Sequence, residues 1–288
     1  MSTDSAVAAA PTRRILRLPS TPFTVGCSLV WIAIVLFIAI FANVLQPYSI
    51  TAMDLGARVQ PPAFLGGQLH HFLGTDQLGR DVLARLIVSI RVSLTIAIGA
   101  TVLGIVFGAL MGIAAAHFGG ILEQIVLTLI DVQAALPFII LALSALAFFG
   151  NSQLLLICLL GLYGWERHAR VVRGLAMAAN RQGYMLAVRQ LGAGPGRLYM
   201  RHLLPNIAAT LVVSATLAFP EVILAASGLS FLGLGIQPPN TDLGNMVGYG
   251  RSYLATAPWI PLAPSVVIVA TTLAISTIGD WLRDKLDA

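Results

Sequence analysis

Residues 92–122 read VSLTIAIGATVLGIVFGALMGIAAAHFGGIL and contain no Asp, Glu, Lys or Arg. Three further runs are equally free of these residues: Arg17 to Asp54, Asp131 to Glu166, and Arg251 to Asp280, counted between their ends. A charged side chain at the centre of a bilayer costs roughly 3 kcal/mol on insertion scales. The runs therefore predict an all-α, polytopic membrane protein.

The composition supports this prediction and excludes an ordinary soluble enzyme. Hydrophobic residues make up 57% of the 288 residues and charged residues 10%, against about 25% charged in soluble domains. The one lysine is Lys285, so the chain has no Gly-Lys-Ser/Thr phosphate loop. If the chain does energised work, the nucleotide chemistry must be on another chain.

Six transmembrane helices are predicted, near residues 23–45, 94–116, 125–149, 153–174, 206–227 and 260–280. The first apolar run is about 22 residues long, too long for the core of a cleaved signal peptide. With the tail 1–22 inside, twelve of the 17 Lys and Arg residues lie on the inner side. Because positive residues favour that side, we expect both termini, including the tail 281–288, in the cytoplasm.

Two long outer loops are expected, at 46–92 and 228–259. The first should contain a short amphipathic helix from Leu78 to Arg91, because Asp76/Arg80 and Asp81/Arg85 are acid–base pairs four residues apart. His70 and His71 are adjacent in this loop. Two histidines without neighbouring metal ligands are a weak signal, so we predict a solvated loop and no metal site.

A stripe of small residues runs along the second predicted span at every fourth position: Ala100, Gly104, Gly108, Gly112 and Ala116. Such a face lets another helix approach closely. The partner is either another helix of this chain or a second subunit, in which case Gly104, Gly108 and Gly112 are subunit-packing residues.

The inner segment 175–205 is basic and carries a helical pattern. Tyr184, Ala187, Val188 and Leu191 form an apolar stripe at helical spacing. The run Gly192–Gly196 must interrupt a helix, and a second short helix is expected from there to Pro205. We expect the apolar face to turn outward from the bundle. From spacing alone it fits the lipid headgroups, the chain's own bundle or a groove on a soluble partner.

This segment resembles the cytoplasmic loop of binding-protein-dependent ABC importer permeases. The matching positions are Leu186-Ala187-Val188, Gly192, His202 and Leu204-Pro205; Leu186, Val188 and His202 replace the Glu, Ala and Ile of the family pattern. Three other segments resemble the oligopeptide/dipeptide/nickel permeases: Leu73–Leu83, Leu229–Gly235 with Gln237-Pro238-Pro239 after it, and Gly279–Asp284. Together they resemble the second, C-type, permease subunit of that family.

The resemblance implies a type I importer permease fold in a bacterial inner membrane. It implies a homologous second permease subunit, two ATPase subunits that hold the ATP and Mg, and a periplasmic substrate-binding protein; this chain would bind no cofactor and no nucleic acid, and would not be an enzyme. Peptides are the expected substrate, with nickel, opines or glutathione as alternatives. The residues expected to couple to the ATPases are Tyr184, Ala187, Val188, Leu191, Gly192, Arg201, Leu204 and Pro205.

Two acids within predicted spans are candidates for the translocation pathway. Acidic residues in a span usually face a cavity or a partner, and Asp131 and Glu221 both lie within apolar runs. The alternatives are that Asp131 pairs with a loop arginine near the cytoplasmic surface and that Glu221 is a hydrogen-bonded structural residue. An ATP-independent secondary transporter is the rival function, but a transporter of that kind would give the basic inner segment no function.

Overall fold

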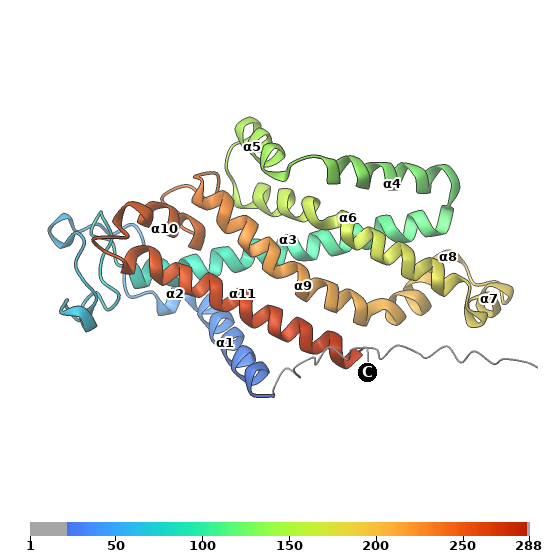
Figure 1. Cartoon of the computed structure of the whole chain (residues 1–288), viewed down its shortest axis with the longest axis horizontal. Coiled ribbons are helices and arrows are strands. Elements are labelled where there is room, and N and C mark those ends of the chain that lie inside the picture. The colour runs from blue at the N-terminus through green and yellow to red at the C-terminus, as the bar shows by residue number, and fades with distance from the viewer. Residues whose placement is uncertain (1–21, 287–288) are drawn as a thin grey trace, which may run out of the picture.

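The computed structural model describes residues 22–286, so the arginines of the predicted N-terminal tail lie outside the described residues. Helices dominate this part of the chain (Figure 1), and the β-structure within it is limited to an isolated bridge between Thr75 and Asp81. This confirms the all-α prediction. The longer elements are α1 (Pro22–Ile40), α3 (Val82–Phe118), α4 (Gly120–Ala135), α5 (Phe138–Phe149), α6 (Gln153–Asn180), α9 (Leu204–Phe231) and α11 (Trp259–Leu286). The shorter ones are α2 (Ala42–Leu45), α7 (Gly183–Gln190), α8 (Pro195–Arg197), α10 (Leu243–Gly250), a π-helical segment (Leu198–Leu203) and 3₁₀ turns at Leu55–Ala57, Ala63–Leu65 and Arg251–Tyr253.

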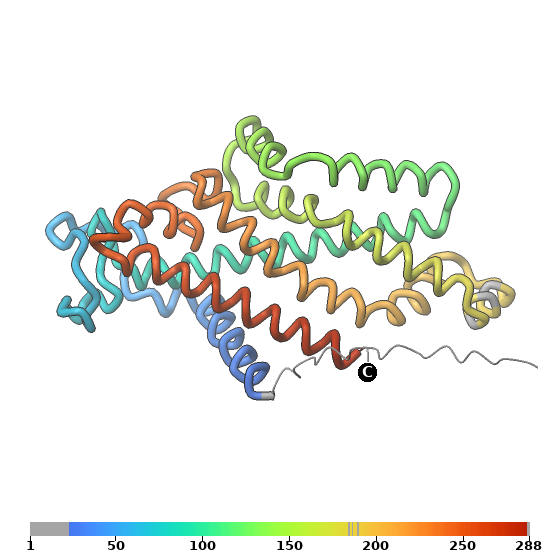
Figure 2. Tube along the Cα trace, viewed as in Figure 1, coloured from blue at the N-terminus to red at the C-terminus, as the bar shows by residue number. Residues whose placement is uncertain are grey.

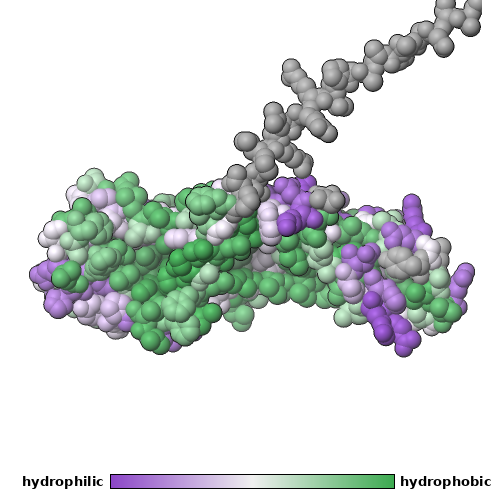
Figure 3. All heavy atoms as spheres, turned by 90° about the horizontal axis from the view of Figure 1, so that it is seen from below, coloured by the Kyte–Doolittle hydropathy of each residue, from purple (hydrophilic) through white to green (hydrophobic). Residues whose placement is uncertain are grey.

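Four helical stretches in residues 22–286 are long and apolar enough to cross a membrane. They are Phe23–Ile40, Val82–Phe118, Pro195–Phe231 and Trp259–Leu286, and the bent pair α4–α5 makes a fifth if it is counted as one span. Figure 3 shows a face that is largely hydrophobic along its length, with hydrophilic residues toward the two ends and a further hydrophilic group at one edge. The structure therefore supports a membrane protein with four or five apolar spans.

The short amphipathic helix expected at Leu78–Arg91 is not a separate element. Helix α3 begins at Val82, where the Asp81 carboxylate accepts a hydrogen bond from the Ala84 backbone N–H at 2.7 Å, and continues without a break to Phe118. The preceding residues form a turn instead, because Gly79 has φ +73°, which favours glycine. The prediction was wrong because Asp81 caps the helix and no helix breaker follows it.

The third predicted span is two helices rather than one. Helices α4 and α5 meet at an angle of 91°, with Leu136 extended and Pro137 at the start of α5. Proline disfavours a helical conformation in the residue before it and fits the beginning of a helix. The apolar run is continuous through this point, so hydropathy alone does not reveal the bend.

The small-residue stripe of α3 packs against α6 of the same chain. A Cβ atom added to Gly104 would lie 2.9 Å from the Gly161 carbonyl oxygen, and one added to Gly108 would lie 2.6 Å from that of Trp165. At Gly112 the corresponding distance, to the Ala169 carbonyl oxygen, is 2.6 Å. Both helices advance by four residues from one contact to the next, so they run parallel. Of the two partners considered, the structure places the stripe on this chain's own α6.

Helix α6 extends further than the predicted span 153–174, to Asn180, and carries the chain to the end where α7 lies. At the opposite end, residues 46–81 meet the segment around α10 (Figure 2). Trp259 Nε1 donates to the Thr75 carbonyl oxygen there, at 3.3 Å. The two long loops predicted on one side of the membrane thus lie together at one end of the bundle.

Candidate functional site

The segment after α6 forms two short helical pieces around a glycine turn. Helix α7 ends at Gln190, and Gly192 then adopts φ +81°. The second piece starts at α8 and becomes the π-helical segment Leu198–Leu203, which runs directly into α9. Pro205 lies in the first turn of α9, directly after the π-helical segment. The segment is therefore continuous with a membrane helix.

The apolar stripe expected on α7 is divided between two environments. Met185 is fully buried, and Val188 packs against the same cluster, which includes Val172 of α6 and Leu203. Ala187 is exposed, and Leu191 is 86% exposed. One side of α7 thus anchors to its own bundle, in contrast to the expected outward-facing stripe, while Ala187 and Leu191 remain available on the surface.

The other residues expected to couple to the ATPases lie around this turn. Gly192 has open space around the position of a Cβ atom, Arg201 and Pro205 are exposed, and Leu204 is half-buried. Tyr184 lies on α7, and its side chain is outside the described residues.

An aromatic contact that the sequence did not predict joins this segment to α3. The Tyr199 hydroxyl and His117 Nδ1 lie 3.0 Å apart, and their rings meet edge to face with centroids separated by 5.2 Å. His117 lies in the last turn of α3, and Tyr199 belongs to the π-helical segment. The two residues are 82 positions apart, so local periodicity gives no sign of the contact.

Three arginines on α6 each pair with an acid from another helix. Arg167 donates to both Glu221 carboxylate oxygens, at 2.8 and 2.7 Å, and Arg170 donates to Asp131 at 2.8 Å. Arg173 pairs with Glu123. The sequence identified Asp131 and Glu221 but not their partners, because the arginines are 39 and 54 residues away.

The first two pairs are exposed in this chain. The Arg167 and Glu221 side chains are 59% and 61% exposed, and those of Arg170 and Asp131 are 52% and 72% exposed. Arg170 belongs to α6 itself rather than to a loop, so the expected loop partner of Asp131 is replaced by a helical one. Both acids lie in apolar helices and neither is buried inside the subunit, so they face something outside it.

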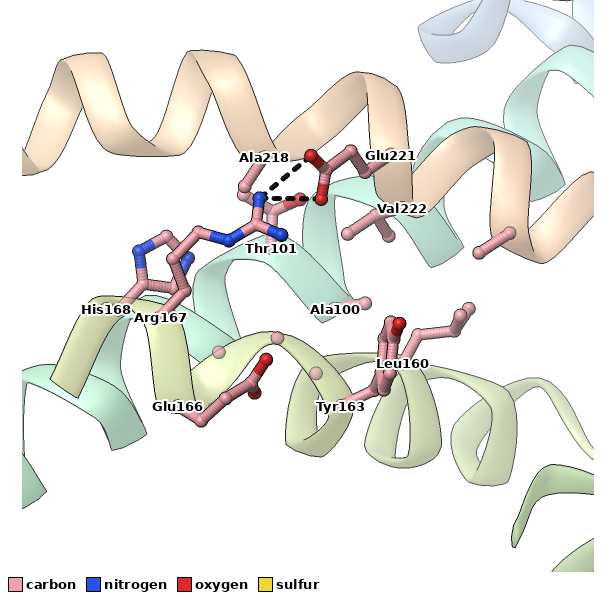
Figure 4. A pocket seen from close by; sticks show the side chains of 14 residues that line it. Ala100, Thr101, Leu160, Tyr163, Glu166, Arg167, His168, Ala218, Glu221 and Val222 are labelled. Atoms are coloured by element: carbon pink, nitrogen blue, oxygen red, sulfur yellow. Dashed lines mark hydrogen bonds and ion pairs between the residues drawn. The ribbon is translucent and has the colours of Figure 1, made fainter. Parts of the chain in front are cut away.

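A narrow pocket lies between α3, α6 and α9 beside the Arg167–Glu221 pair (Figure 4). Glu166 lines it and accepts a hydrogen bond from Gln133 at 3.3 Å. His168 lines it as well, and its Nδ1 lies 2.8 Å from Ser214 Oγ. The pocket therefore combines two carboxylates, one guanidinium and an imidazole, a set that suits binding of charged groups rather than nucleophilic chemistry.

A buried polar network holds the opposite end of the bundle together. The Asp76 carboxylate accepts from the backbone N–H groups of Leu78 and Arg80 at 2.8 and 3.0 Å and from Arg80 Nε at 2.7 Å. It also accepts from Arg85, which reaches Thr241 in the 228–259 loop at 3.3 Å. Asp76, Arg80 and Arg85 are all buried. The Leu73–Leu83 segment thus has a structural role, because its acid neutralises two buried arginines.

Two further groups at this end of the bundle are placed by the structure. His71 Nδ1 lies 2.9 Å from Asp81, and His70 is exposed. Asp242 caps α10 by accepting from the Asn245 backbone N–H at 3.0 Å. Burial raises the pKa of the Asp242 carboxyl above its usual value, although hydrogen bonds from the Asn245 backbone and the Ser230 side chain act in the opposite direction.

Comparison with known proteins is consistent with this arrangement. The family model described as "binding-protein-dependent transport system inner membrane component" matches residues 104–288. The chain is 36% identical over 260 residues to the di/tripeptide transport system permease protein of Pseudomonas aeruginosa, covering 90% of this chain and 86% of the relative. It is 38% identical over 276 residues to a putative peptide transport system permease protein of Brucella suis, covering 96% and 90%. It is 33% identical over 257 residues to the oligopeptide transport system permease protein of Mycobacterium tuberculosis, covering 88% and 87%. On this evidence the chain belongs to the family of inner membrane components of binding-protein-dependent transport systems.

Proposed function

We propose that this chain is one of two membrane-spanning subunits of a peptide importer of the ABC class and forms half of its translocation pathway. The observation that carries the proposal is the pair of exposed ion pairs on α6. Lipid is an unfavourable neighbour for Arg167–Glu221 and Arg170–Asp131, whereas an aqueous pathway or a second subunit accommodates them. The peptide permeases among its relatives favour a peptide as the substrate.

Six crossings with both termini in the cytoplasm fit the helix directions. Because α3 and α6 run parallel, the α4–α5 pair must bring the chain back between them. Counting α6 as a crossing despite its charges then gives α1, α3, α4–α5, α6, α9 and α11. Pairing of its arginines with acids on α4 and α9 lowers the cost of placing them there.

The partners follow from the two ends of the bundle. We propose that two ATPase subunits, which hold the ATP and Mg, bind at the α7 end and that a periplasmic binding protein docks on the outer loops. The homologous permease subunit would face the exposed pairs of α6. This chain itself would bind no cofactor.

Coupling to the ATPases is assigned to the surface of the 183–205 loop. Its exposed residues Ala187, Leu191 and Arg201 offer apolar and basic contacts. The buried side chain of Met185 fixes the loop to the helix bundle. Gly192 and Pro205 set the turn and the junction with α9. A helix held in this way can transmit movement of a partner to α6 and α9.

Reconstitution provides the test. The chain, its partner permease, the two ATPases and the binding protein are co-purified into proteoliposomes, and uptake of a labelled dipeptide is measured with and without ATP. We expect uptake to require ATP and the binding protein. Uptake by this chain alone, without ATP, would favour a secondary transporter instead.

A further inference from the structure

We propose that the pocket beside Arg167 and Glu221 binds the charged ends of a zwitterionic peptide, which replaces the internal ion pair by two ion pairs of its own. The inference rests on the proposed function, because it needs this face of α6 to line the pathway. It specifies what the pocket recognises, which is a free ammonium group and a free carboxylate on the same substrate.

The pocket is built to let a small group approach the helix backbones. Its lining includes Ala100 and Gly104 of α3 and Gly161 and Gly164 of α6, none of which has a side chain larger than a methyl group. The charged side chains stand around this small-residue surface (Figure 4). A site of this shape suits the terminus of a peptide rather than a bulky side chain.

The internal ion pair is suited to exchange. Both of its hydrogen bonds come from a single nitrogen, Arg167 Nη1, so the guanidinium does not use the two-nitrogen fork that a carboxylate ligand favours. Each side chain is more than half exposed, and exposed ion pairs contribute only about 0–1 kcal/mol. A substrate carboxylate can therefore compete for Arg167, and a substrate ammonium for Glu221.

An unsatisfied hydroxyl in the pocket points to a ligand independently of the charges. Thr101 is 7% exposed, and its Oγ1 atom is buried with no hydrogen-bond partner in the described part of the chain. Figure 4 draws this oxygen toward the Arg167–Glu221 pair. Buried polar atoms nearly always have a partner, and a helical threonine often uses the carbonyl four residues before it. A carboxylate on Arg167 would give Thr101 an acceptor.

The balance of charge favours a zwitterion over a simple ion. Glu166 and Glu221 flank Arg167, and all three line the pocket. A zwitterion adds one positive and one negative group, so the net charge of the site does not change when it is occupied. A single anion on Arg167, or a single cation on Glu221, would instead leave the other member of the pair without its counter-charge, which is costly. The ammonium then lies by Glu221 and Glu166, and the carboxylate by Arg167 and Thr101.

Occupancy of the pocket can be measured with a cysteine at Ala218, which lines it. In the assembled transporter carrying Cys27→Ser and Cys158→Ala, the Ala218→Cys thiol is labelled by a membrane-impermeant reagent, without binding protein. We expect millimolar alanyl-alanine to slow labelling by about threefold or more, a change equivalent to a weak millimolar site. The same concentration of N-acetyl-alanyl-alanine amide, which has neither charge, should not slow it. Equal protection by both peptides, or by neither, overturns the proposal.

Two variants sharpen the assignment. Glu221→Gln should abolish the protection by alanyl-alanine, whereas Glu123→Gln, which removes the acid paired with Arg173 outside the pocket, should leave it intact. The double variant Arg167→Glu/Glu221→Arg keeps an internal pair but reverses its direction. We expect the double variant to assemble but to take up peptide at least about tenfold more slowly than the wild type. Wild-type uptake in the double variant would show that the pair is structural.

The two proposals fail in different ways. If the Ala218→Cys thiol is unreactive, or if its labelling leaves uptake unchanged, this face of α6 does not line the pathway. The ion pairs on α6 then no longer support the proposed function. If labelling blocks uptake but alanyl-alanine gives no protection, the pathway assignment stands and the exchange of ion pairs is refuted.

Discussion

Gly108→Ala tests the close packing of α3 on α6. The added methyl group would lie 2.6 Å from the Trp165 carbonyl oxygen, 2.7 Å from the His168 Cβ and 3.1 Å from the Ala169 backbone nitrogen. Two of these atoms belong to the backbone and cannot rotate away, so the helices must separate. Overpacking of this kind costs about 1–3 kcal/mol.

Helix propensity acts in the opposite direction and needs a matched control. Replacing a helical glycine by alanine gains about 1 kcal/mol, and this gain applies equally to Gly174→Ala on α6. Gly174 is exposed and has nothing within 4 Å of an added Cβ atom. The difference between the two variants therefore isolates the steric cost.

The assay is the thermal midpoint of the purified assembly in one detergent, followed by loss of a monodisperse peak. At about 2–4 °C per kcal/mol, Gly108→Ala should melt roughly 2–12 °C below Gly174→Ala. A Gly108→Ala protein as stable as Gly174→Ala would refute the packing of the glycine stripe on this chain's own helix.

Three further predictions concern the two ends of the bundle. Asp76→Asn should lower stability by about 3–5 kcal/mol in the same thermal assay, because it leaves two buried arginines without their carboxylate; Asp54→Asn, at an exposed 3₁₀ cap, should have little effect. Burial raises the pKa of Asp242 in the folded state, so its protonated form favours folding at low pH and this contribution is lost as the pH rises through the folded-state pKa; the midpoint of Asp242→Asn relative to wild type should increase with pH, and a pH-independent difference would contradict this. Met185→Ala should destabilise the loop by about 2–5 kcal/mol, seen as faster proteolysis at that loop, whereas Leu191→Ala should leave proteolysis unchanged and weaken ATPase binding, measured by co-purification.

Hydropathy predicted most of the helices because a segment that crosses lipid must consist mainly of apolar residues. The predicted spans 23–45, 94–116, 125–149, 206–227 and 260–280 correspond to α1, α3, the α4–α5 pair, α9 and α11. What hydropathy missed are changes of direction. The 91° bend depends on one proline inside an apolar run, and the start of α3 depends on the capping carboxylate of Asp81.

The sequence predicted only one member of each ion pair in the candidate site. An acid in an apolar run is visible in the sequence, so Asp131 and Glu221 were identified as unusual. Their arginine partners lie on α6, and which acid each arginine meets depends on how α4 and α9 pack against that helix. Thr101 carried no signal at all, because a threonine in an apolar helix is ordinary until its missing hydrogen-bond partner is seen.

The position of α6 links the pocket to the 183–205 loop. One face of this helix is fixed to α3 by close glycine contacts, and its arginines are bound to α4 and α9 by ion pairs. From Arg167 the helix continues unbroken to Asn180, a rise of about 20 Å, and α7 begins three residues later. A displacement of α7 is therefore carried along a rigid element to the Arg167–Glu221 pair, while the tight contact with α3 limits which way α6 can move. Motion of α6 relative to α9 would lengthen that ion pair first, because an exposed pair resists separation less than packed backbone does. Under the proposed function, movement of an ATPase at the 183–205 loop would therefore open the Arg167–Glu221 pair and release a peptide from the pocket.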